Sequence, residues 1–572
     1  MSFSTVDVLI IGAGPAGLIS AYNLSQAGLH LRIVDKKPKR LEKGQGDVFQ
    51  IRGMEIVDSL GLASPILEGA QRCSHTAAYQ STPTSNGEIS LVARKSAVEG
   101  VDTNMPFMGM FPQSSLEGIL REAIASGRKH IPSATFLPQS QSLGNPTKLS
   151  VEQGVFPVKM KVESTSINER YPVVVSLKHP NGEIETVRAQ YLLGCDGAHS
   201  WIRAQLGIQM IGETSTGMLI RTFLMFVHCA HSTTMVDTGS GPREADTVRF
   251  TIQLSESDVS VDPETGRVDR TKVGADRMIE IVKDMMKPYR VDFDQEIHWS
   301  GVYVIGQRLA SRYQDENSRV FIIGDACHTH SPHAGQGMNA AINDAHNLSW
   351  KLVHVLKGWA TRDLLNTIQY ESERRGFAVK LIELHERIAE FMSGERRRVR
   401  LTSNFMASSM KFVCGVGTHY PASIAVDPSN QTLAPGIVIG ERFPHHIILR
   451  TADLRPYSTL DLLKSDNIYK LIILTGDAKD TNQKQKLEEV GKTLNHWLLQ
   501  RPRMFQIYTI MVAKKETASY TDIQSLYDLT GIQSFSTTRD MRRRQGRKGL
   551  SDFRVGPEGC VALVRPTGML RR

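Results

Sequence analysis

The chain has 572 residues and a formal net charge of +9, with 40% hydrophobic and 22% charged residues. That length exceeds one ordinary core, so we expect two or three globular domains, and the composition excludes a low-complexity chain. The positive charge suits an anionic ligand such as a dinucleotide. The arginine runs 396–398 and 542–544 are more typical of solvated surface than of a nucleic-acid site.

The cysteines and the apolar segments exclude further classes. The six cysteines are widely spaced, with no Cys-x-x-Cys pair, which argues against a structural zinc site and a disulfide framework. The apolar stretch Val8–Ile19 is too short to span a bilayer and is broken by three glycines and a proline. We therefore expect a reducing, cytoplasmic location, with neither a membrane nor a nucleic acid as partner.

The first forty residues predict a dinucleotide-binding βαβ unit. Val6–Ile11 is the near-continuous apolar run of a strand that is buried on both faces. There follow Gly12-Ala13-Gly14-Pro15-Ala16-Gly17, a helical pattern through Ala27, and a second strand, Leu29–Val34, that ends at Asp35. This full context makes the glycine pattern a much stronger signal than it is alone.

The residues of this unit have physical roles in binding a dinucleotide. Gly12 permits the tight turn, Gly14 lets a pyrophosphate approach the backbone, and Gly17 lets the helix pack against the strand. The helix N-terminus presents free N–H groups and a partial positive charge to the phosphates. Asp35 is placed to accept hydrogen bonds from a ribose diol. The motif by itself leaves FAD and NAD as alternatives.

Two later segments also lead from a buried strand through a tight turn into a helix. The first is Tyr191–Arg203, with its turn at Cys195-Asp196-Gly197. The second is strand Val320–Ile323, followed by Gly324-Asp325-Ala326-Cys327-His328-Thr329-His330-Ser331-Pro332-His333-Ala334-Gly335-Gln336-Gly337 and a long helix from Met338-Asn339. Its glycines permit close backbone approach to a ring that carries negative charge, as reduced flavin does. The three histidines fit no standard metal spacing, so no metal is predicted.

With these three blocks in this order, the chain resembles the class A FAD-dependent aromatic monooxygenases, and most closely the phenol 2-monooxygenase family. The resemblance implies an α/β fold, in which a Rossmann-like FAD-binding domain carries an inserted β-sheet substrate domain. It implies that Asp325 binds the ribityl chain of FAD and that Asp196 and Arg203 belong to the framework around FAD and NAD(P)H. It also implies FAD contacts for Gln113, Pro332, Gly335, Gly337, Met338 and Asn339. For Gln113, a polar N-cap before a helix from about Ser114 is the alternative.

The family plan also implies domain bounds. The FAD-binding domain would occupy residues 1–410 in segments of about 1–75, 110–205 and 300–410, and the substrate domain about 75–110 and 205–300. Residues 430–572 would form a thioredoxin-like C-terminal domain, and its lack of a Cys-x-x-Cys pair favours a structural or dimer-forming role. The resemblance therefore implies a homodimer.

The resemblance further implies catalytic residues. In the loop Gly44-Gln45-Gly46-Asp47, Asp47 matches an aspartate that lies over the flavin and helps to deprotonate the substrate phenol. Phenolate is far more electron-rich than phenol, so a nearby base speeds attack on an electrophilic oxygen. The alternative is that Asp47 only stabilises its own loop. Arg243 and Arg249 match two arginines that approach the active site.

One departure from the family concerns the substrate. Phenol hydroxylase has a tyrosine two residues after the second arginine, which binds the substrate hydroxyl, whereas this chain has Thr251. A shorter side chain enlarges that side of the pocket. We therefore expect a larger phenolic substrate, such as an aromatic polyketide intermediate, rather than phenol itself.

The expected reaction is that of an FAD-dependent monooxygenase. NAD(P)H reduces FAD, oxygen adds to give a flavin C4a-hydroperoxide, and its distal oxygen hydroxylates the ring in a site that the protein keeps dry. Epoxidation, Baeyer–Villiger insertion, decarboxylation and a non-catalytic FAD-binding protein are the alternatives. NADH and NADPH are both open as the donor.

Overall fold

The structure is a computed structural model that covers most of the chain. It describes residues 3–43, 46–81, 87–127, 145–163, 170–226, 241–242, 247–254, 260–261, 268–269, 275–292, 299–330, 335–366, 369–392, 409–451, 453–476, 480–499, 504–512, 533–537, 553–556 and 558–571. Several positions named above lie outside these described residues: Gly44, Gln45, Arg243, Ser331, Pro332, His333, Ala334 and the arginine runs 396–398 and 542–544.

The first sheet is built around parallel strands. In the described residues its members are β1 (Phe3–Ile11), β2 (Leu31–Asp35), β8 (Val151–Gln153), β9 (Phe156–Val162), β10 (Val173–Lys178), β11 (Ile184–Gly194) and β18 (Val320–Ile322). Strand β1 lies between β2 and β11 and is parallel to both, and β18 is parallel to the end of β11. Leu9 and Ile10 have no exposed surface, because helices cover a sheet of this kind on both faces.

The same part of the chain contains several helices. They are α1 (Pro15–Gln26), α2 (Ile51–Ser59), α3 (Ala63–Gly69), α4 (Gln113–Ser126), α5 (Trp201–Gln205), the 3-10 turn η3 (Gly324–Ala326), α7 (Gln336–Leu356), η5 (Arg362–Leu365) and α8 (Tyr370–Met392). Helix α1 connects β1 to β2 and packs along α7, and their apolar faces belong to one large core. As predicted, the βαβ unit comes first and a long helix follows the third block.

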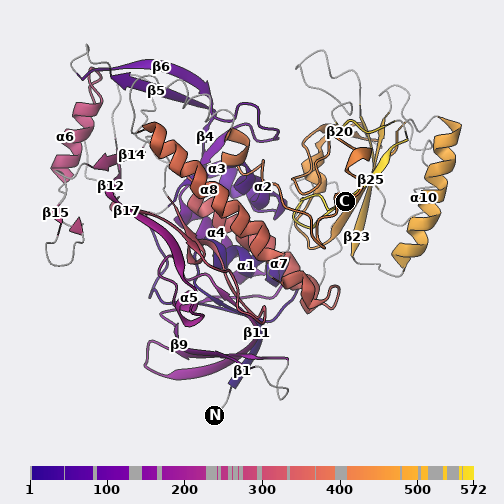
Figure 1. The fold of residues 1–572 in the computed structure, drawn as a ribbon, viewed down its shortest axis with the longest axis horizontal. Coiled ribbons are helices and arrows are strands. Elements are labelled where there is room, and N and C mark those ends of the chain that lie inside the picture. Colours follow the sequence, from indigo (N-terminus) through magenta and orange to yellow (C-terminus); the bar gives the residue numbers. More distant parts are fainter. Residues whose placement is uncertain are drawn as a thin grey trace.

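A second group of strands forms a separate layer. Strands β12 (Met210–Phe226), β13 (Gly241–Pro242), β14 (Thr247–Leu254), β17 (Trp299–Ala310) and β19 (His328–Thr329) make one antiparallel sheet. Short ladders join β3 (Val48–Phe49), β4 (Gln71–Cys73) and β7 (Met108–Met110), then β5 (His75–Ser81) and β6 (Ile89–Ser96), and β15 (Ser260–Val261) and β16 (Val268–Asp269). Figure 1 shows the β5–β6 hairpin beside α6 (Ala275–Met285), at the end of the molecule far from the C-terminal region.

The C-terminal region has its own mixed sheet and core. The sheet contains β20 (Ile447–Arg450), β21 (Pro456–Ser458), β22 (Tyr469–Leu474), β23 (Phe505–Val512), β24 (Gln533–Thr537) and β25 (Cys560–Val564). Helix α10 (Thr481–Leu499) joins the parallel strands β22 and β23, and antiparallel β25 lies on the other side of β22. The 3-10 turns η6 (Gln431–Leu433) and η7 (Thr459–Leu462) complete this region, with α10 on its outer side in Figure 1. None of the described helices combines the length and the apolar character needed to cross a bilayer.

Candidate active site

The three turns predicted from the sequence meet at one edge of the parallel sheet. The last paired residues are Ile11 in β1, Gly194 in β11 and Ile322 in β18, and they lie in register across the three strands. Each strand is followed by one of the three turns, because the carboxyl ends of parallel strands share an edge. Ligands of open α/β sheets bind at this edge, so the three blocks of sequence point to one site.

Glycines allow these segments to come into backbone contact. A Cβ atom at Gly12 would lie 2.2 Å from the carbonyl oxygen of Cys195, which no side chain permits. At Gly324 a Cβ atom would lie 3.0 Å from that of Ala341 in α7 and 3.5 Å from that of Ala16 in α1. The close packing of the first block on the second and third therefore requires glycine at both positions.

The start of α1 has the features of a phosphate site. Its N-cap is Gly14, and no side chain caps the helix. The space at the Cβ position of Gly14 is open, with no heavy atom within 4 Å. Asp35 accepts a hydrogen bond of 2.8 Å from the Ala13 amide. The carboxylate that was predicted to bind a ribose therefore lies directly beside this turn. Uncapped N–H groups next to open space fit the pyrophosphate of a dinucleotide.

The turn after β18 carries Asp325, which is exposed to solvent. The surrounding protein nevertheless raises the pKa of its carboxyl by desolvation. Arg203 fixes the turn from the second block, because its guanidinium donates hydrogen bonds to the carbonyl oxygens of Ala326 (3.0 Å) and Ala198 (2.9 Å). Asp325 therefore stands where a polar chain such as ribityl could pass.

The start of α7 supplies a second uncapped helix end. Gly335 is its N-cap, without a side-chain cap, and the Cβ position of Gly337 has no heavy atom within 4 Å. This open, positively polarised end fits the negative charge of a reduced flavin ring. Met338 is buried beside it, 3.4 Å from where a Cβ atom of Gly46 would lie.

Asn339, which was predicted to contact the cofactor, holds the neighbouring loop with its side chain. Its amide nitrogen donates to the carbonyl oxygens of Val48 (2.8 Å) and Gly335 (2.7 Å), and its oxygen accepts from the Gln50 amide at 3.0 Å. Both amide hydrogens are therefore used within the protein. Asn339 ties the start of α7 to β3, which follows Asp47 in the chain.

Asp47 and Arg249 form an ion pair between two parts of the fold. Asp47 precedes β3, whereas Arg249 lies in β14 of the antiparallel sheet, and a guanidinium nitrogen of Arg249 contacts a carboxylate oxygen of Asp47. The two side chains are only 13% and 14% exposed. Two of the three residues that the resemblance made catalytic are thus in direct contact, and the third, Arg243, lies outside the described residues.

The backbone around Asp47 is held from both sides. The Phe111 amide donates to the Asp47 carbonyl oxygen at 2.8 Å, and the Gln113 amide donates to that of Gly46 at 2.9 Å. Gln113 also donates from its side chain to Glu117 at 2.9 Å. The N-cap of α4 is Pro112, so the alternative of Gln113 as N-cap is wrong. Gln113 supports the Asp47 loop, which contacts the same end of α7.

A buried charge network lies beside the Asp325 turn, and nothing in the sequence indicated it. Asp344 of α7 accepts from Arg374 of α8 at 2.5 Å and lies 2.8 Å from Nε2 of His328. Burial alone would raise the pKa of the Asp344 carboxyl, but Arg374 and His328 hold it below its ordinary value. The Gly324 amide donates to the same carboxylate at 3.2 Å. The network therefore supports the Asp325 turn.

In the described part of the chain, no group of three metal-ligating side chains is found.

Comparison with known families agrees with this geometry. The FAD binding domain family matches residues 5–131 and 128–385, and the phenol hydroxylase C-terminal dimerisation domain matches residues 418–569. The chain is 30% identical to 3-hydroxybenzoate 4-monooxygenase of Comamonas testosteroni over 561 residues, which cover 92% of this chain and 82% of the relative. It is 27% identical to phenol 2-monooxygenase fsqG of Aspergillus fumigatus, over 99% of this chain and 93% of that one.

A solved structure shares the fold over nearly the whole length. The flavin-dependent monooxygenase PieE, crystallised with FAD and substrate, superimposes with a TM-score of 0.68 at 19% identity, over 99% of this chain and 95% of that chain. The likeness extends from the FAD-binding domain through the C-terminal region. The expected aromatic hydroxylase fold is therefore confirmed.

Proposed function

Because the chain belongs to the FAD-dependent monooxygenases related to phenol hydroxylase, we propose that it hydroxylates a phenolic substrate beside the Asp47–Arg249 pair, with NAD(P)H as the electron donor typical of the family. FAD is its cofactor. The observation that carries the proposal is this pair, because it sets a carboxylate and a guanidinium, both largely shielded from water, next to the flavin end of α7.

The residues of the first and third blocks would hold the cofactor. The N-terminus of α1, with Gly14 and Asp35, fits the adenosine and pyrophosphate, and Asp325 with the start of α7 fits the ribityl chain and ring. When bound, FAD supplies electron transfer from the nicotinamide and delivery of one oxygen atom from dioxygen. The protein supplies position, charge and exclusion of water.

Asp47 and Arg249 would prepare the substrate for this chemistry. A carboxylate oxygen of Asp47 accepts the proton of the phenol hydroxyl, which makes the ring electron-rich at its ortho and para carbons. Arg249 compensates the negative charge on Asp47 before the proton moves and that on the phenolate afterwards. Asn339 keeps the Asp47 loop at a fixed position relative to the start of α7.

The substrate is proposed to be larger than phenol. Thr251 follows Arg249 by two residues in β14, where phenol hydroxylase has a tyrosine, so the chain lacks that bulk and that hydroxyl donor. A substituted phenol or an aromatic polyketide fits such a pocket better. The match of residues 418–569 to a dimerisation domain supports a homodimer as the working form.

A substrate screen tests this proposal. The purified yellow protein would be offered phenol, 3-hydroxybenzoate and bulkier phenols, with NAD(P)H loss, peroxide and product mass followed together. We expect a bulky phenol to give a product heavier by one oxygen atom, with little peroxide. Efficient turnover of phenol alone would contradict the expected size. A lactone or decarboxylated product would contradict ring hydroxylation, and peroxide alone with every phenol would contradict the choice of substrate class.

A further inference from the structure

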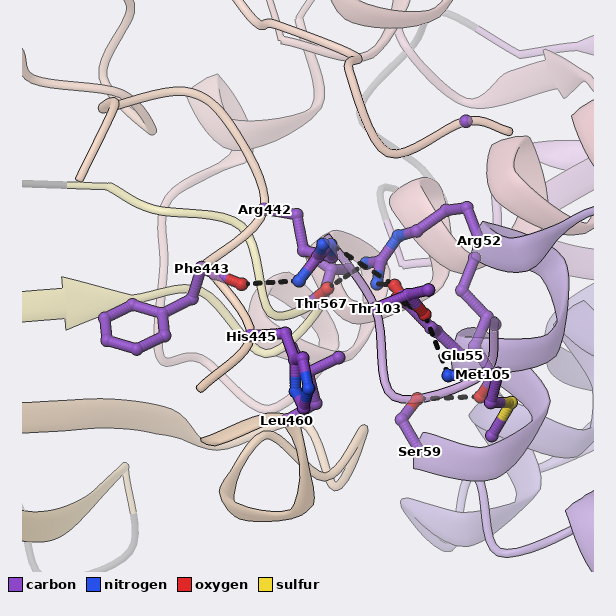
Figure 2. Close-up of polar contacts among 12 residues, drawn as sticks. Arg52, Glu55, Ser59, Thr103, Met105, Arg442, Phe443, His445, Leu460 and Thr567 are labelled. Carbon is purple, nitrogen blue, oxygen red and sulfur yellow. Dashed lines mark hydrogen bonds and ion pairs between the residues drawn. The ribbon is translucent and has the colours of Figure 1, made fainter. Parts of the chain in front are cut away.

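A cluster of charges joins the C-terminal region to segments next to the Asp47 loop. We call it the Arg442 cluster and define it as Arg52 and Glu55 of α2, Asp102, Thr103 and Arg442. Figure 2 shows Arg52, Glu55, Thr103 and Arg442. Nε of Arg442 lies 3.3 Å from a carboxylate oxygen of Glu55, and another guanidinium nitrogen donates to the carbonyl oxygen of Asp102. The same Glu55 accepts from Arg52 at 3.1 Å and from Thr103 at 3.2 Å.

Three charged side chains of the cluster are buried, so their geometry is tightly constrained: Arg52, Glu55 and Arg442 are 8%, 6% and 5% exposed. The Glu55 carboxylate pairs with both arginines, and Arg52 also donates to the Thr567 carbonyl oxygen at 2.7 Å. The Asp102 carboxylate, 3.4 Å from Arg442, is 40% exposed. Removal of one partner from such a cluster leaves an uncompensated buried charge. The elements that carry these side chains are therefore held at fixed relative positions.

The two segments that Arg442 contacts in the FAD-binding domain are both connected to Asp47. Helix α2 begins at Ile51, immediately after β3 and the Asp47 loop. Asp102 and Thr103 lead into β7, and Met110 of β7 pairs with Val48 of β3. The next residue, Phe111, donates to the Asp47 carbonyl oxygen. Arg442 thus contacts, through Glu55 and Asp102, the two segments that flank Asp47.

A second contact from the C-terminal region supports the same arrangement. The hydroxyl of Ser465 lies 2.6 Å from that of Ser59, at the end of α2, and 2.7 Å from Nε2 of His346 in α7. The C-terminal region therefore contacts α2 and α7 together. Asn339, near the start of α7, joins the N-terminal ends of these two helices. Its side chain bonds to the backbone of Val48 in β3 and of Gln50, the N-cap of α2.

We propose that the C-terminal region is part of the hydroxylation machinery, in which Arg442 is a positioning residue that fixes the Asp47 loop through Glu55 and Asp102. This goes beyond a role in dimerisation. The structural part stands on the contacts above, and only its catalytic consequence rests on the proposed function. Arg442 touches neither substrate nor cofactor in this proposal.

Hydrogen–deuterium exchange of the FAD-loaded dimer tests the structural part without a substrate. The variants are Arg442→Met, Arg442→Lys and the control Arg450→Met, which removes the pair of Arg450 with Asp453 inside the β20–β21 hairpin. In Arg442→Met we expect the peptide covering 46–60 to exchange at least about tenfold faster, with β1 and β11 unchanged. Arg442→Lys should give a smaller change and Arg450→Met none.

Two results would overturn the inference. One is unchanged exchange of 46–60 in Arg442→Met; the other is an equal rise throughout the FAD-binding domain, which would indicate general destabilisation. The catalytic readout is the amount of product per NAD(P)H on the phenol that the wild-type protein converts. We expect a fall of about tenfold in Arg442→Met, with FAD content retained. If the protein converts no phenol, the proposed function fails while the exchange result still decides the role of Arg442.

Discussion

Arg249 of the antiparallel sheet forms an ion pair with Asp47, which comes just before β3 and α2 in the chain. The contact joins two layers that the chain builds from distant segments. Because both side chains are largely buried, each charge depends on the other for compensation.

Replacement of Asp47 should separate cofactor binding from catalysis. Asp47→Ala is expected to bind FAD normally but to lose about 10²- to 10⁴-fold in product formation, the usual contribution of a general base. Product and peroxide would be measured at saturating phenol. Arg249→Met should have a similar effect, and the double variant should lose little more than either single one because the two groups act together. Undiminished hydroxylation by Asp47→Ala would remove Asp47 from the mechanism.

Two glycines of the first turn should respond differently to alanine. At Gly14 the Cβ position is open, so Gly14→Ala should fold normally but bind FAD at least about tenfold more weakly, because the methyl group meets the pyrophosphate. Gly12→Ala would clash with the Cys195 carbonyl oxygen and should destabilise the domain itself. Thermal melting of the apoproteins and FAD titration distinguish the two effects. Wild-type FAD affinity in Gly14→Ala would contradict the assigned phosphate position.

FAD affinity should depend on pH through Asp325. Desolvation by the surrounding protein raises the pKa of this carboxyl, and hydrogen bonds from ribityl hydroxyls would favour its ionised form. The cofactor then binds better to the carboxylate, so affinity is full above the raised pKa and falls as the pH drops through it. Asp325→Asn should lack this dependence. Fluorescence titration of apoprotein between neutral and mildly acidic pH measures it, and parallel curves for both proteins would refute the assignment.

Glu373 should contribute to acid stability at the contact with the C-terminal region. It binds Arg565 at 2.7 and 3.0 Å and Lys351 at 2.9 Å. Burial opposes its ionisation, but these two cations lower its pKa from 4.5 to about 2. A lowered pKa in the folded state gives stability that is present above 4.5 and is lost as the pH falls toward 2, at most about 3 kcal/mol.

Glu373→Gln tests this contribution. The variant should be less stable at neutral pH by about 3–5 kcal/mol, because two buried cations lose their carboxylate. Its stability should also fall less steeply between pH 4.5 and 3 than that of the wild type. Urea unfolding at a series of pH values measures both effects. If the two proteins lose stability in parallel over this range, Glu373 is not the group responsible.

The parallel sheet and its turns could be predicted from sequence because their signals are local. Continuous apolar runs predicted the positions of β1 and β18, and glycines predicted the turns that follow them. Their convergence also follows from the sequence, since parallel strands end at a shared edge. The Asp47–Arg249 contact is different, because no periodicity connects a loop to a strand of another sheet. The family resemblance made both residues candidates for the active site but did not predict that they touch.

The contacts of the C-terminal region could not be predicted from sequence. Arg52 and Glu55 are spaced as an ordinary solvent-exposed helix pair, and nothing near them shows that Arg442 covers them. The side-chain contact of Asn339 with the β3 backbone was not predicted either. The groups that Glu55 and Asn339 bind come from distant segments of the chain, Arg442 for Glu55 and the Val48 carbonyl for Asn339.

The contacts of Arg52 with Thr567 and of Glu373 with Arg565 also have a consequence for biosynthesis. As the chain leaves the ribosome, α2 and α8 emerge long before the segment that neutralises their buried charges. Until synthesis has passed residue 567, Arg52 has only its pair with Glu55, and Glu373 has only its pair with Lys351. We expect tight retention of the flavin to be a post-translational event, completed only when this late segment docks.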